Sequence, residues 1–313
     1  MRTLRTLALA LAIALPGCLQ GQDGAREAPV VATFYPLAFF AERIAGDNLA
    51  VATLVPAGTE PHDWEPRPSE RVRVERASVF VYNGAGLEPW ADEFVRDLTA
   101  RGAVVVEATR GLALREADRP HEGDPGQDET GTHEEHEGTK DPHVWLDPVL
   151  AQGVVENIRA GLARADPGNA TAYGARATSF SAELAALHGE FERGLARCGN
   201  RNILTTHAAF GYLADRYDFL MHSVHGLTPE AEPSPAKIRE MVNLARALNL
   251  THVFFETLVS PRVAEVIADE VGAQVLVLNP IEGLTAEERA AGKTYFDLHR
   301  QNLANLRLAM RCG

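Results

Sequence analysis

The sequence predicts an α/β protein with two doubly wound lobes built on parallel sheets and joined by a long rigid backbone helix. Three observations predict this architecture. Short apolar strands alternate with helices of about ten residues in both halves of the 313-residue chain, which is typical of parallel sheets. Between the halves, apolar residues recur at three- and four-residue steps. The chain is long enough for two domains, and its 45% hydrophobic content is enough for two cores.

The N-terminal lobe is expected to cover residues 29–165 and to begin with a buried strand at Val30. Helices and strands then alternate as far as a strand that ends at Val106. The expected strands are 30–34, 49–55, 79–82 and 103–106, and the expected helices are 37–44, 68–77 and 89–100.

A single helix over residues 166–197 is expected to link the lobes. Asp166 and Pro167 supply an N-cap and a first-turn proline. Large apolar side chains then recur along one side of the helix, at Phe180, Leu184, Leu187, Phe191 and Leu195. A helix of roughly 30 residues is about 45 Å long, the length of a whole domain. It would act as a rigid spine.

The C-terminal lobe, residues 198–313, repeats the alternation. Its expected strands are 202–206, 219–224, 253–255 and 274–278, with helices between them, one of which runs from Pro235 to Leu248. In an oxidising compartment Cys198 and Cys312 are a candidate disulfide, which would fasten the C-terminus to the start of this lobe. The alternative is two buried thiols.

The first residues are typical of an export signal. Two arginines precede an apolar run, Leu7–Leu15, that is too short to span a bilayer. Leu15-Pro16-Gly17-Cys18 resembles a bacterial lipobox, in which the cysteine is acylated; the alternative is an ordinary signal with an incidental cysteine. We expect a signal peptide at 1–17, a polar tether at 18–28, and an exported protein that is periplasmic or at the cell surface, with Cys18 as its candidate lipid anchor.

The net charge and one unusual segment limit the kinds of partner that the protein can bind. The formal net charge of −13 argues against nucleic acid and against a polybasic membrane patch. Residues 115–142 hold ten acids and three histidines, His121, His133 and His136, but no aliphatic residue larger than alanine. Such a segment cannot bury a core, so we expect it to be disordered without a ligand. His-rich acidic tracts often bind metals loosely; the alternative is a solvated acidic insertion.

Three other histidines lie on loops with metal-site character. Glu60-Pro61-His62-Asp63-Trp64 and Asp141-Pro142-His143-Val144-Trp145 nearly repeat each other. Because proline fixes the backbone, each imidazole sits on a stiff loop. His207 ends an apolar run, which indicates the top of a strand. Neutral imidazole suits Zn²⁺ and the other late first-row metals, and three imidazoles with one oxygen ligand make a near-tetrahedral zinc site.

These residues resemble a known family, the metal-binding cluster of ABC-transporter solute-binding proteins. The matching segments run in unbroken order and are 61–69, 142–148, 207–212 and 230–234. The resemblance implies a metal in the interlobe cleft, held for a membrane permease, with His62, His143 and His207 as ligands. Histidine in the third position, and the His-rich segment, resemble the zinc branch of the family rather than the manganese branch.

The fourth ligand is where the sequence departs from the family. Many members place aspartate at the position of Asn279, and an amide is a weaker ligand for zinc. Glu282 is the preferred substitute because it follows the strand 274–278, whose C-terminal end should face the cleft. Glu60, Asn279 itself and a water molecule are the alternatives. Glu256 is expected to be a structural group that orients a histidine.

We therefore expect a monomeric extracytoplasmic receptor that carries Zn²⁺ to an ABC importer and is not an enzyme. A receptor for manganese or another divalent metal, and a metal-dependent adhesin, are alternatives. A zinc hydrolase is disfavoured because the chain has no HExxH or GxSxG motif. His188 and His299 are expected on solvated helix faces. No metal role is expected for the remaining histidines outside the acidic segment, His222, His225 and His252.

Overall fold

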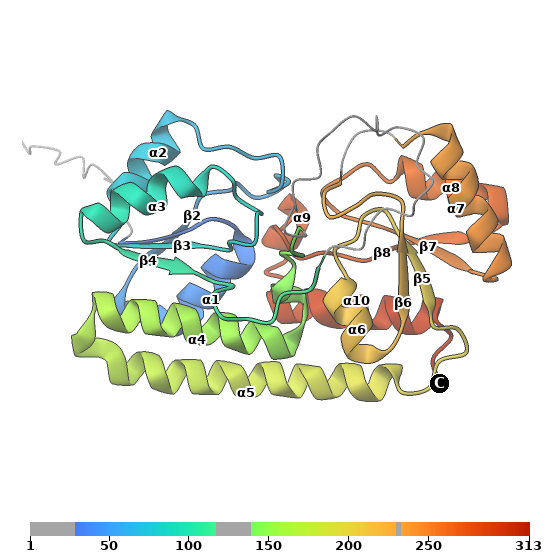
Figure 1. Cartoon of the computed structure of the whole chain (residues 1–313). Coiled ribbons are helices and arrows are strands. Elements are labelled where there is room, and N and C mark those ends of the chain that lie inside the picture. Colours follow the sequence, from blue (N-terminus) through green and yellow to red (C-terminus); the bar gives the residue numbers. More distant parts are fainter. Residues whose placement is uncertain (1–28, 117–138, 230–232) are drawn as a thin grey trace, which may run out of the picture.

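The computed structural model describes residues 29–116, 139–229 and 233–313. Two α/β lobes lie side by side above a pair of long helices (Figure 1). Within the described ranges, no helix combines the length and apolarity needed to cross a bilayer. The expected signal peptide and tether, and most of the acidic His-rich segment, lie outside the described residues.

The N-terminal lobe is built on four strands and the helices that cover them. The elements are β1 (Val30–Ala32), β2 (Val51–Thr53), β3 (Val79–Tyr82), β4 (Val104–Glu107), α1 (Tyr35–Ala45), α2 (Pro68–Glu75), α3 (Ala91–Ala100) and α4 (Pro148–Ala165). The strands form one parallel sheet in the order β2-β1-β3-β4. Helices α2 and α3 lie on one face and α1 and α4 on the other (Figure 1). The central strands β1 and β3 are buried along their whole length, as this two-sided cover requires.

The C-terminal lobe pairs its strands in parallel as β5–β6 and β7–β8, two pairs rather than one continuous ladder, with β5 against β7. The strands are β5 (Asn202–Thr205), β6 (Leu220–Ser223), β7 (His252–Phe255) and β8 (Gln274–Val277). The helices are α6 (Gly211–Tyr217), α7 (Pro235–Ala247), α8 (Arg262–Val271), α9 (Ala286–Ala290) and α10 (Tyr295–Ala309). All eight expected strands are present within two residues of their expected bounds.

The expected linking segment, residues 166–197, forms one long helix after a short turn, and this helix packs along α4. After α4 ends at Ala165, a 3-10 turn at Pro167–Asn169 leads into α5, which spans Ala170–Leu195. Asp166 is not the N-cap of α5; its carboxylate instead accepts hydrogen bonds from Asn169 Nδ2 and the Tyr173 hydroxyl, at 2.7 and 2.6 Å. Helix α5 has 26 residues, about 39 Å. Its expected apolar side chains are all buried, so the spine face was predicted correctly.

One hydrophobic core runs from the N-terminal sheet across α5 into the C-terminal lobe. His299, expected on a solvated face, is fully buried in this region. Its ring centroid lies 4.4 Å from that of Tyr295 and 5.9 Å from that of Phe191. Burial lowers the pKa of His299 to about 3, so the imidazole is neutral. The expectation was wrong because α10 turns this face toward α5, which helical periodicity alone does not reveal.

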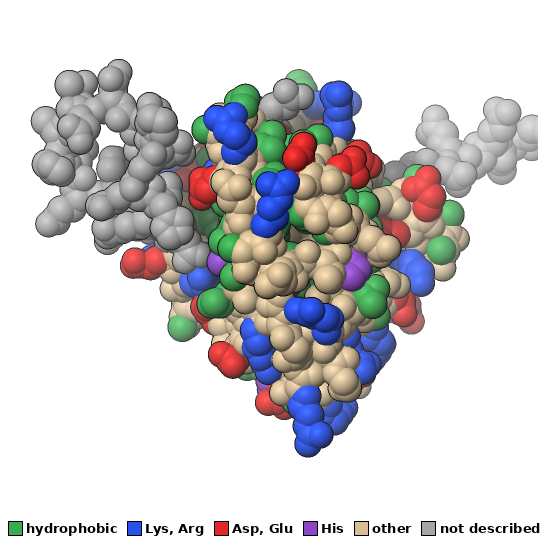
Figure 2. Space-filling view, turned by 90° about the vertical axis from the view of Figure 1, so that its right-hand side faces the viewer, with side chains coloured by type: hydrophobic (Ala, Val, Ile, Leu, Met, Phe, Trp, Pro, Cys, Tyr) green, Lys and Arg blue, Asp and Glu red, His purple; other side chains and the backbone are tan. Residues whose placement is uncertain are grey.

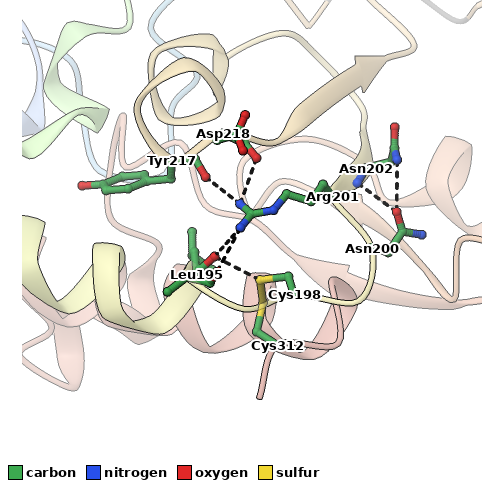
Figure 3. Close-up of a disulfide and its surroundings, with 9 residues drawn as sticks. Leu195, Cys198, Asn200, Arg201, Asn202, Tyr217, Asp218 and Cys312 are labelled. Atoms are coloured by element: carbon green, nitrogen blue, oxygen red, sulfur yellow. Dashed lines mark hydrogen bonds between the residues drawn. A yellow bond between two sulfur atoms is a disulfide. The ribbon is translucent and has the colours of Figure 1, made fainter.

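The expected disulfide joins Cys198 to Cys312 (Figure 3). It ties the segment after α5 to the C-terminus across 114 residues. Beside it, the Arg201 guanidinium donates hydrogen bonds to backbone carbonyls at the ends of α5 and α6. Two helix ends and the C-terminus are therefore fastened at one place.

The outer face of the C-terminal lobe is mixed in character (Figure 2). Lys and Arg side chains gather toward the lower end of this view, and hydrophobic side chains are dispersed over it. In the described part of this lobe, the large exposed apolar side chains are Leu220, Val266 and Leu308, from three separate elements. Single exposed apolar residues are normal, so we assign no docking face to them.

Candidate metal centre

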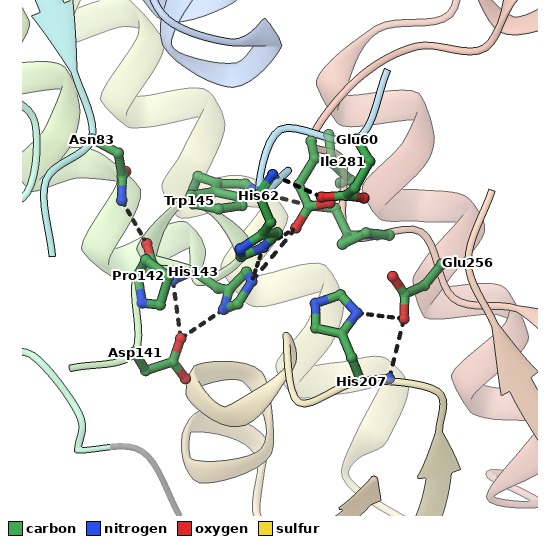
Figure 4. A network of polar contacts seen from close by, with 12 residues as sticks. Glu60, His62, Asn83, Asp141, Pro142, His143, Trp145, His207, Glu256 and Ile281 are labelled. Atoms are coloured by element: carbon green, nitrogen blue, oxygen red, sulfur yellow. Dashed lines mark hydrogen bonds and ion pairs between the residues drawn. The ribbon is translucent and has the colours of Figure 1, made fainter. Parts of the chain in front are cut away.

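Three histidines and one glutamate meet where the two lobes face each other (Figure 4). His62 lies in the loop between β2 and α2, and His143 immediately precedes the 3-10 turn Val144–Leu146 that leads into α4. His207 follows β5 and Glu282 follows β8. One donor atom from each residue lies within 4.8 Å of the others. Each lobe therefore contributes two members of the cluster.

The donor atoms have the spacing of a tetrahedral site. His62 Nε2 lies 3.2 Å from His143 Nε2, and Glu282 Oε1 lies 3.3 and 3.5 Å from these two nitrogens. Ligands about 2.0–2.1 Å from a zinc ion at tetrahedral angles are about 3.3 Å apart. The His207 ring completes the cluster, with its centroid 5.8 Å from that of His62 and 5.4 Å from that of His143.

Some polar atoms of the cluster are buried without a hydrogen-bond partner among the described residues. They are His207 Nε2 and Glu282 Oε2, whereas Glu282 Oε1 faces His62 Nε2 and His143 Nε2 at 3.3 and 3.5 Å. His207 is fully buried and Glu282 is 1% exposed. Leaving such a group unsatisfied costs about 1–3 kcal/mol, and more when it is charged. A divalent cation would satisfy these atoms, so the residues present fit a metal ion.

Carboxylates behind two of the histidines fix the orientation of their rings. Asp141 Oδ1 lies 2.8 Å from His143 Nδ1 and also accepts the His143 backbone N–H at 3.0 Å. Glu256 Oε1 lies 2.6 Å from His207 Nδ1 and accepts the Thr206 hydroxyl at 2.6 Å. With Nδ1 engaged, Nε2 of each ring is left for a metal. Sequence patterns indicated this role for Glu256 but missed Asp141, although its place two residues before His143 was a usable signal.

Protonation is shared unequally within the cluster. Burial would lower the pKa of His143, but the carboxylates of Asp141 and Glu282 raise it to about 9. Burial would raise the pKa of Glu282, but hydrogen bonding to His143 and His62 holds it well below its usual range. Burial lowers the pKa of His62. At neutral pH the metal-free cluster therefore carries a proton on His143, which a cation must displace.

The alternatives for the fourth ligand are placed differently from Glu282. Glu60 Oε1 accepts the His62 backbone N–H at 3.1 Å, and Glu60 Oε2 is buried with no hydrogen-bond partner in the described ranges. Burial and the nearby Glu282 charge raise the pKa of Glu60 to about 9, so it is a neutral acid at pH 7. The Asn279 side-chain oxygen is already engaged within its own turn, because this Oδ1 accepts the Ile281 N–H at 2.7 Å. Of the two carboxylates, the donor cluster contains that of Glu282.

The other described histidines stand apart from the cluster. His188 is half-buried, with Nδ1 3.1 Å from the Tyr217 hydroxyl. His222 Nε2 lies 3.1 Å from Asn202 Oδ1. The histidines of the acidic segment, His121, His133 and His136, lie outside the described residues.

A two-lobed α/β fold that gathers three imidazoles and a carboxylate from both lobes defines a metal-binding protein of the solute-receptor class. Residues 30–309 match the family described as zinc-uptake complex component A, periplasmic, and the chain belongs to this family. The match confirms the resemblance seen in the sequence motifs. The family consists of uptake components, not of enzymes.

Two relatives of the chain have names that refer to zinc uptake or zinc binding. The chain is 37% identical over 279 residues to the high-affinity zinc uptake system protein ZnuA of Bacillus subtilis, which covers 89% of this chain and 86% of that protein. It is 33% identical to the zinc-binding lipoprotein AdcA of Streptococcus pneumoniae serotype 4, over 96% of this chain and 59% of AdcA. The chain thus spans less than two thirds of AdcA.

Solved structures share the two-lobed fold. The Zn(II)-bound ZnuA-like domain of Streptococcus pneumoniae AdcA is similar with a TM-score of 0.75 and 32% identity, covering 90% of this chain and 98% of that one. A mutant of the laminin-binding adhesin Lmb of Streptococcus agalactiae has a TM-score of 0.78 and 29% identity, covering 90% and 99%. These likenesses confirm the predicted fold class.

Proposed function

We propose that the protein is an extracytoplasmic receptor that captures Zn²⁺ and hands it to the membrane permease of an ABC importer. The observation that carries the proposal is the cluster of three imidazole nitrogens and one carboxylate oxygen within 4.8 Å of one another. Membership of the zinc-uptake family supports the process. Zinc is the cargo here rather than a resident cofactor.

The proposed ligands are His62, His143, His207 and Glu282. Three neutral imidazoles and one carboxylate complete a four-coordinate site and reduce its charge from +2 to +1. Imidazole nitrogen suits Zn²⁺, whereas Mn²⁺ prefers carboxylate and water oxygens in octahedral geometry. The donor set therefore favours a zinc receptor over a manganese receptor.

Release of the ion follows from how the ligands are divided. His62 and His143 come from the N-terminal lobe, and His207 and Glu282 from the C-terminal lobe. A small separation of the lobes would leave two ligands on each side, too few to hold zinc tightly. The continuous core through α5 opposes a wide hinge motion, so we propose that the permease needs only a local displacement.

The remaining parts of the proposal concern the cellular location and the domain organisation of the protein. We propose that residues 1–17 are a signal peptide, that residues 18–28 are a tether, and that Cys18 carries a lipid anchor. We also propose that the receptor is a monomer. Its lobes would cover residues 29–165 and 198–313 and be joined by residues 166–197. The name lipoprotein, given to the related AdcA, supports the anchor. Mass spectrometry of the mature N-terminus should find an acylated Cys18; an unmodified N-terminus beyond it would contradict the anchor.

Metal analysis of the purified mature protein tests the function. After incubation with equal amounts of Zn²⁺ and Mn²⁺ and removal of free metal, we expect one tightly bound zinc ion per chain and little bound manganese. Retention of manganese in preference to zinc would contradict the proposal. Because Lmb is named an adhesin, a deletion strain should also be grown under zinc limitation. Normal zinc uptake with lost adhesion would favour an adhesin.

A further inference from the structure

The turn that carries Glu282 has a strained backbone. Ile281 has a φ of 58°, in the left-handed region that a β-branched residue rarely adopts. Such a conformation is energetically unfavourable and persists only where its surroundings impose it. The Glu282 carboxylate lies 3.3 Å from His62 Nε2 and 3.5 Å from His143 Nε2, so it contacts the other lobe and not its own turn. Other groups must therefore hold this backbone in place.

Asn302, on α10, holds the start of the turn through its side-chain amide. Its Oδ1 accepts the Asn279 N–H at 2.8 Å, and its Nδ2 donates to the Asn279 carbonyl at 2.6 Å. The fully buried amide thus pairs with Asn279 as a neighbouring strand would, just beyond the end of β8. Asn279 in turn restrains the backbone of Ile281, because its own Oδ1 accepts the Ile281 N–H.

Trp145 holds the same turn from the other lobe (Figure 4). Its indole Nε1 donates to the Pro280 carbonyl at 2.8 Å. Trp145 is fully buried and lies two residues after His143, with the two ring centroids 5.2 Å apart. The Tyr295 hydroxyl donates to the Trp145 carbonyl, which ties this segment to α10 as well. The backbone position of Glu282 is therefore coupled to that of His143.

We propose that Asn302 and Trp145 are positioning residues that hold Glu282 at ligating distance and keep the site four-coordinate. The inference rests on the proposed function, because it takes Glu282 as the fourth zinc ligand. A fixed fourth ligand suits Zn²⁺, for which tetrahedral coordination is usual. A mobile turn would admit water and the higher coordination numbers that suit Mn²⁺. The two residues thus contribute to metal selectivity from behind the ligands.

Asn305 offers a matched control on the same helix. It lies one turn after Asn302, and its Nδ2 donates to the Val277 carbonyl, within β8, at 2.7 Å. Asn305 ties α10 to the last residue of β8, whereas Asn302 ties it to Asn279 at the start of the turn. A purely structural role predicts similar effects of Asn302→Ala and Asn305→Ala on zinc affinity. A positioning role predicts that only Asn302→Ala weakens zinc binding.

The test is a double-mutant cycle on zinc affinity in the full mature chain, measured by competition with a chromophoric chelator. We expect Asn302→Ala to weaken zinc binding by about tenfold, as is common for groups that orient a ligand. In the Glu282→Gln protein, the same change should alter affinity by less than about twofold, because the group it positions no longer binds. Equal losses in the two backgrounds, or an equal loss in Asn305→Ala, would overturn the proposal.

Cobalt substitution supplies a readout that stability alone would not move. Four-coordinate Co²⁺ absorbs visible light much more strongly than Co²⁺ with five or six ligands. The Asn302→Ala protein should lose this intensity and part of its preference for Zn²⁺ over Mn²⁺, whereas Asn305→Ala should keep both. An unchanged cobalt spectrum in Asn302→Ala would also overturn the proposal.

The outcomes distinguish this inference from the proposed function. If the parent protein does not bind zinc, both fail; if Glu282→Gln binds zinc as the parent does, the fourth-ligand assignment and this inference fail together. If Glu282→Gln weakens binding and Asn302→Ala does not, this inference alone fails. Should Asn302→Ala not fold, Trp145→Phe takes its place in the cycle, because it keeps an aromatic ring and removes the N–H. The expected and the overturning results are the same.

Discussion

The loops that carry His62 and His143 are near copies in sequence, yet they hold their histidines differently. In each loop a carboxylate accepts the backbone N–H of the histidine two residues later, Glu60 at 3.1 Å and Asp141 at 3.0 Å. Asp141 also reaches the ring, 2.8 Å from His143 Nδ1. The second oxygen of Glu60 is instead buried beside Glu282. Glu60 is one methylene longer than Asp141, and its carboxylate lies beside Glu282, whereas that of Asp141 orients the ring of its own histidine.

The surroundings of the two loops reinforce this difference. The His143 loop is fixed from both lobes, because Asn83 Nδ2 donates to the Pro142 carbonyl at 3.0 Å and the Tyr212 hydroxyl to the Asp141 carbonyl at 2.7 Å. The pKa of His143 is raised to about 9, mainly by Asp141 against the effect of burial, whereas burial lowers that of His62. The same motif therefore supplies one locked ligand that carries a proton and one neutral ligand.

The comparison breaks down if any one of the three histidines is dispensable. We expect His62→Ala, His143→Ala and His207→Ala each to weaken zinc binding about a thousandfold, about 4 kcal/mol. The remaining ligands would be too few to repay dehydration of the ion. Titration calorimetry gives the affinities, and circular dichroism checks that each variant is folded. Affinity near that of the parent in one variant would remove that histidine from the ligand set.

The raised pKa of His143 predicts a strong pH dependence. Zinc binds neutral imidazole, and His143 holds its proton below a pKa of about 9. Affinity should therefore fall as pH falls, by about tenfold per unit or about a hundredfold from pH 8 to pH 6. Calorimetry at pH 7.5 in buffers of different ionisation enthalpy should count about one proton released per zinc. Binding without proton release would show that His143 is already neutral.

The two glutamates near the site sharpen the comparison further. Glu282→Gln keeps the size and removes the charge, so zinc affinity should fall by at least about tenfold, about 1.4 kcal/mol. Glu60→Gln should stay within about twofold of the parent, because Glu60, with a pKa of about 9, is already neutral at pH 7. The reverse pattern would place the fourth ligand on the first loop.

Asp141→Asn is expected to have the smallest effect on affinity. The amide oxygen can still accept from His143 Nδ1, so zinc binding should weaken by only about fivefold. The pKa of His143 should fall at the same time, because the neighbouring charge that raises it is gone. Proton release at pH 7.5 should therefore drop in Asp141→Asn and remain as in the parent for Glu60→Gln. Unchanged release in Asp141→Asn would show that another group raises that pKa.

Local patterns in the sequence account for what was predicted at the site. Proline-fixed loops and strand ends located His62, His143 and His207. Glu282 was preferred to Asn279 near the end of the last strand because a carboxylate is a stronger zinc ligand than an amide. Features that depend on how elements face one another were not accessible. The place of Asp141 two residues before His143 made it a candidate, but its contact with the ring also depends on the ring orientation. The burial of His299 depends on which side of α10 meets α5.

Helix α4 shows the same limit in the fold. It was not predicted, and it carries Gly153 and Gly161, a residue type that lowers helix propensity. Both glycines serve close packing: an added Cβ would lie 2.4 Å from a Leu112 methyl group at the first and 2.2 Å from a Val106 methyl group at the second. Tertiary contact, not local propensity, explains these residues.

Anomalous diffraction at the zinc edge from crystals of the zinc-loaded protein tests the central claim most directly. That claim is a four-coordinate zinc site shared by the two lobes. We predict one peak about 2.0–2.2 Å from Nε2 of His62, His143 and His207 and from one oxygen of Glu282, with Glu60 outside bonding distance. A peak bound by Glu60 in place of Glu282, or by a histidine of the acidic segment in place of one of the three, would contradict the account.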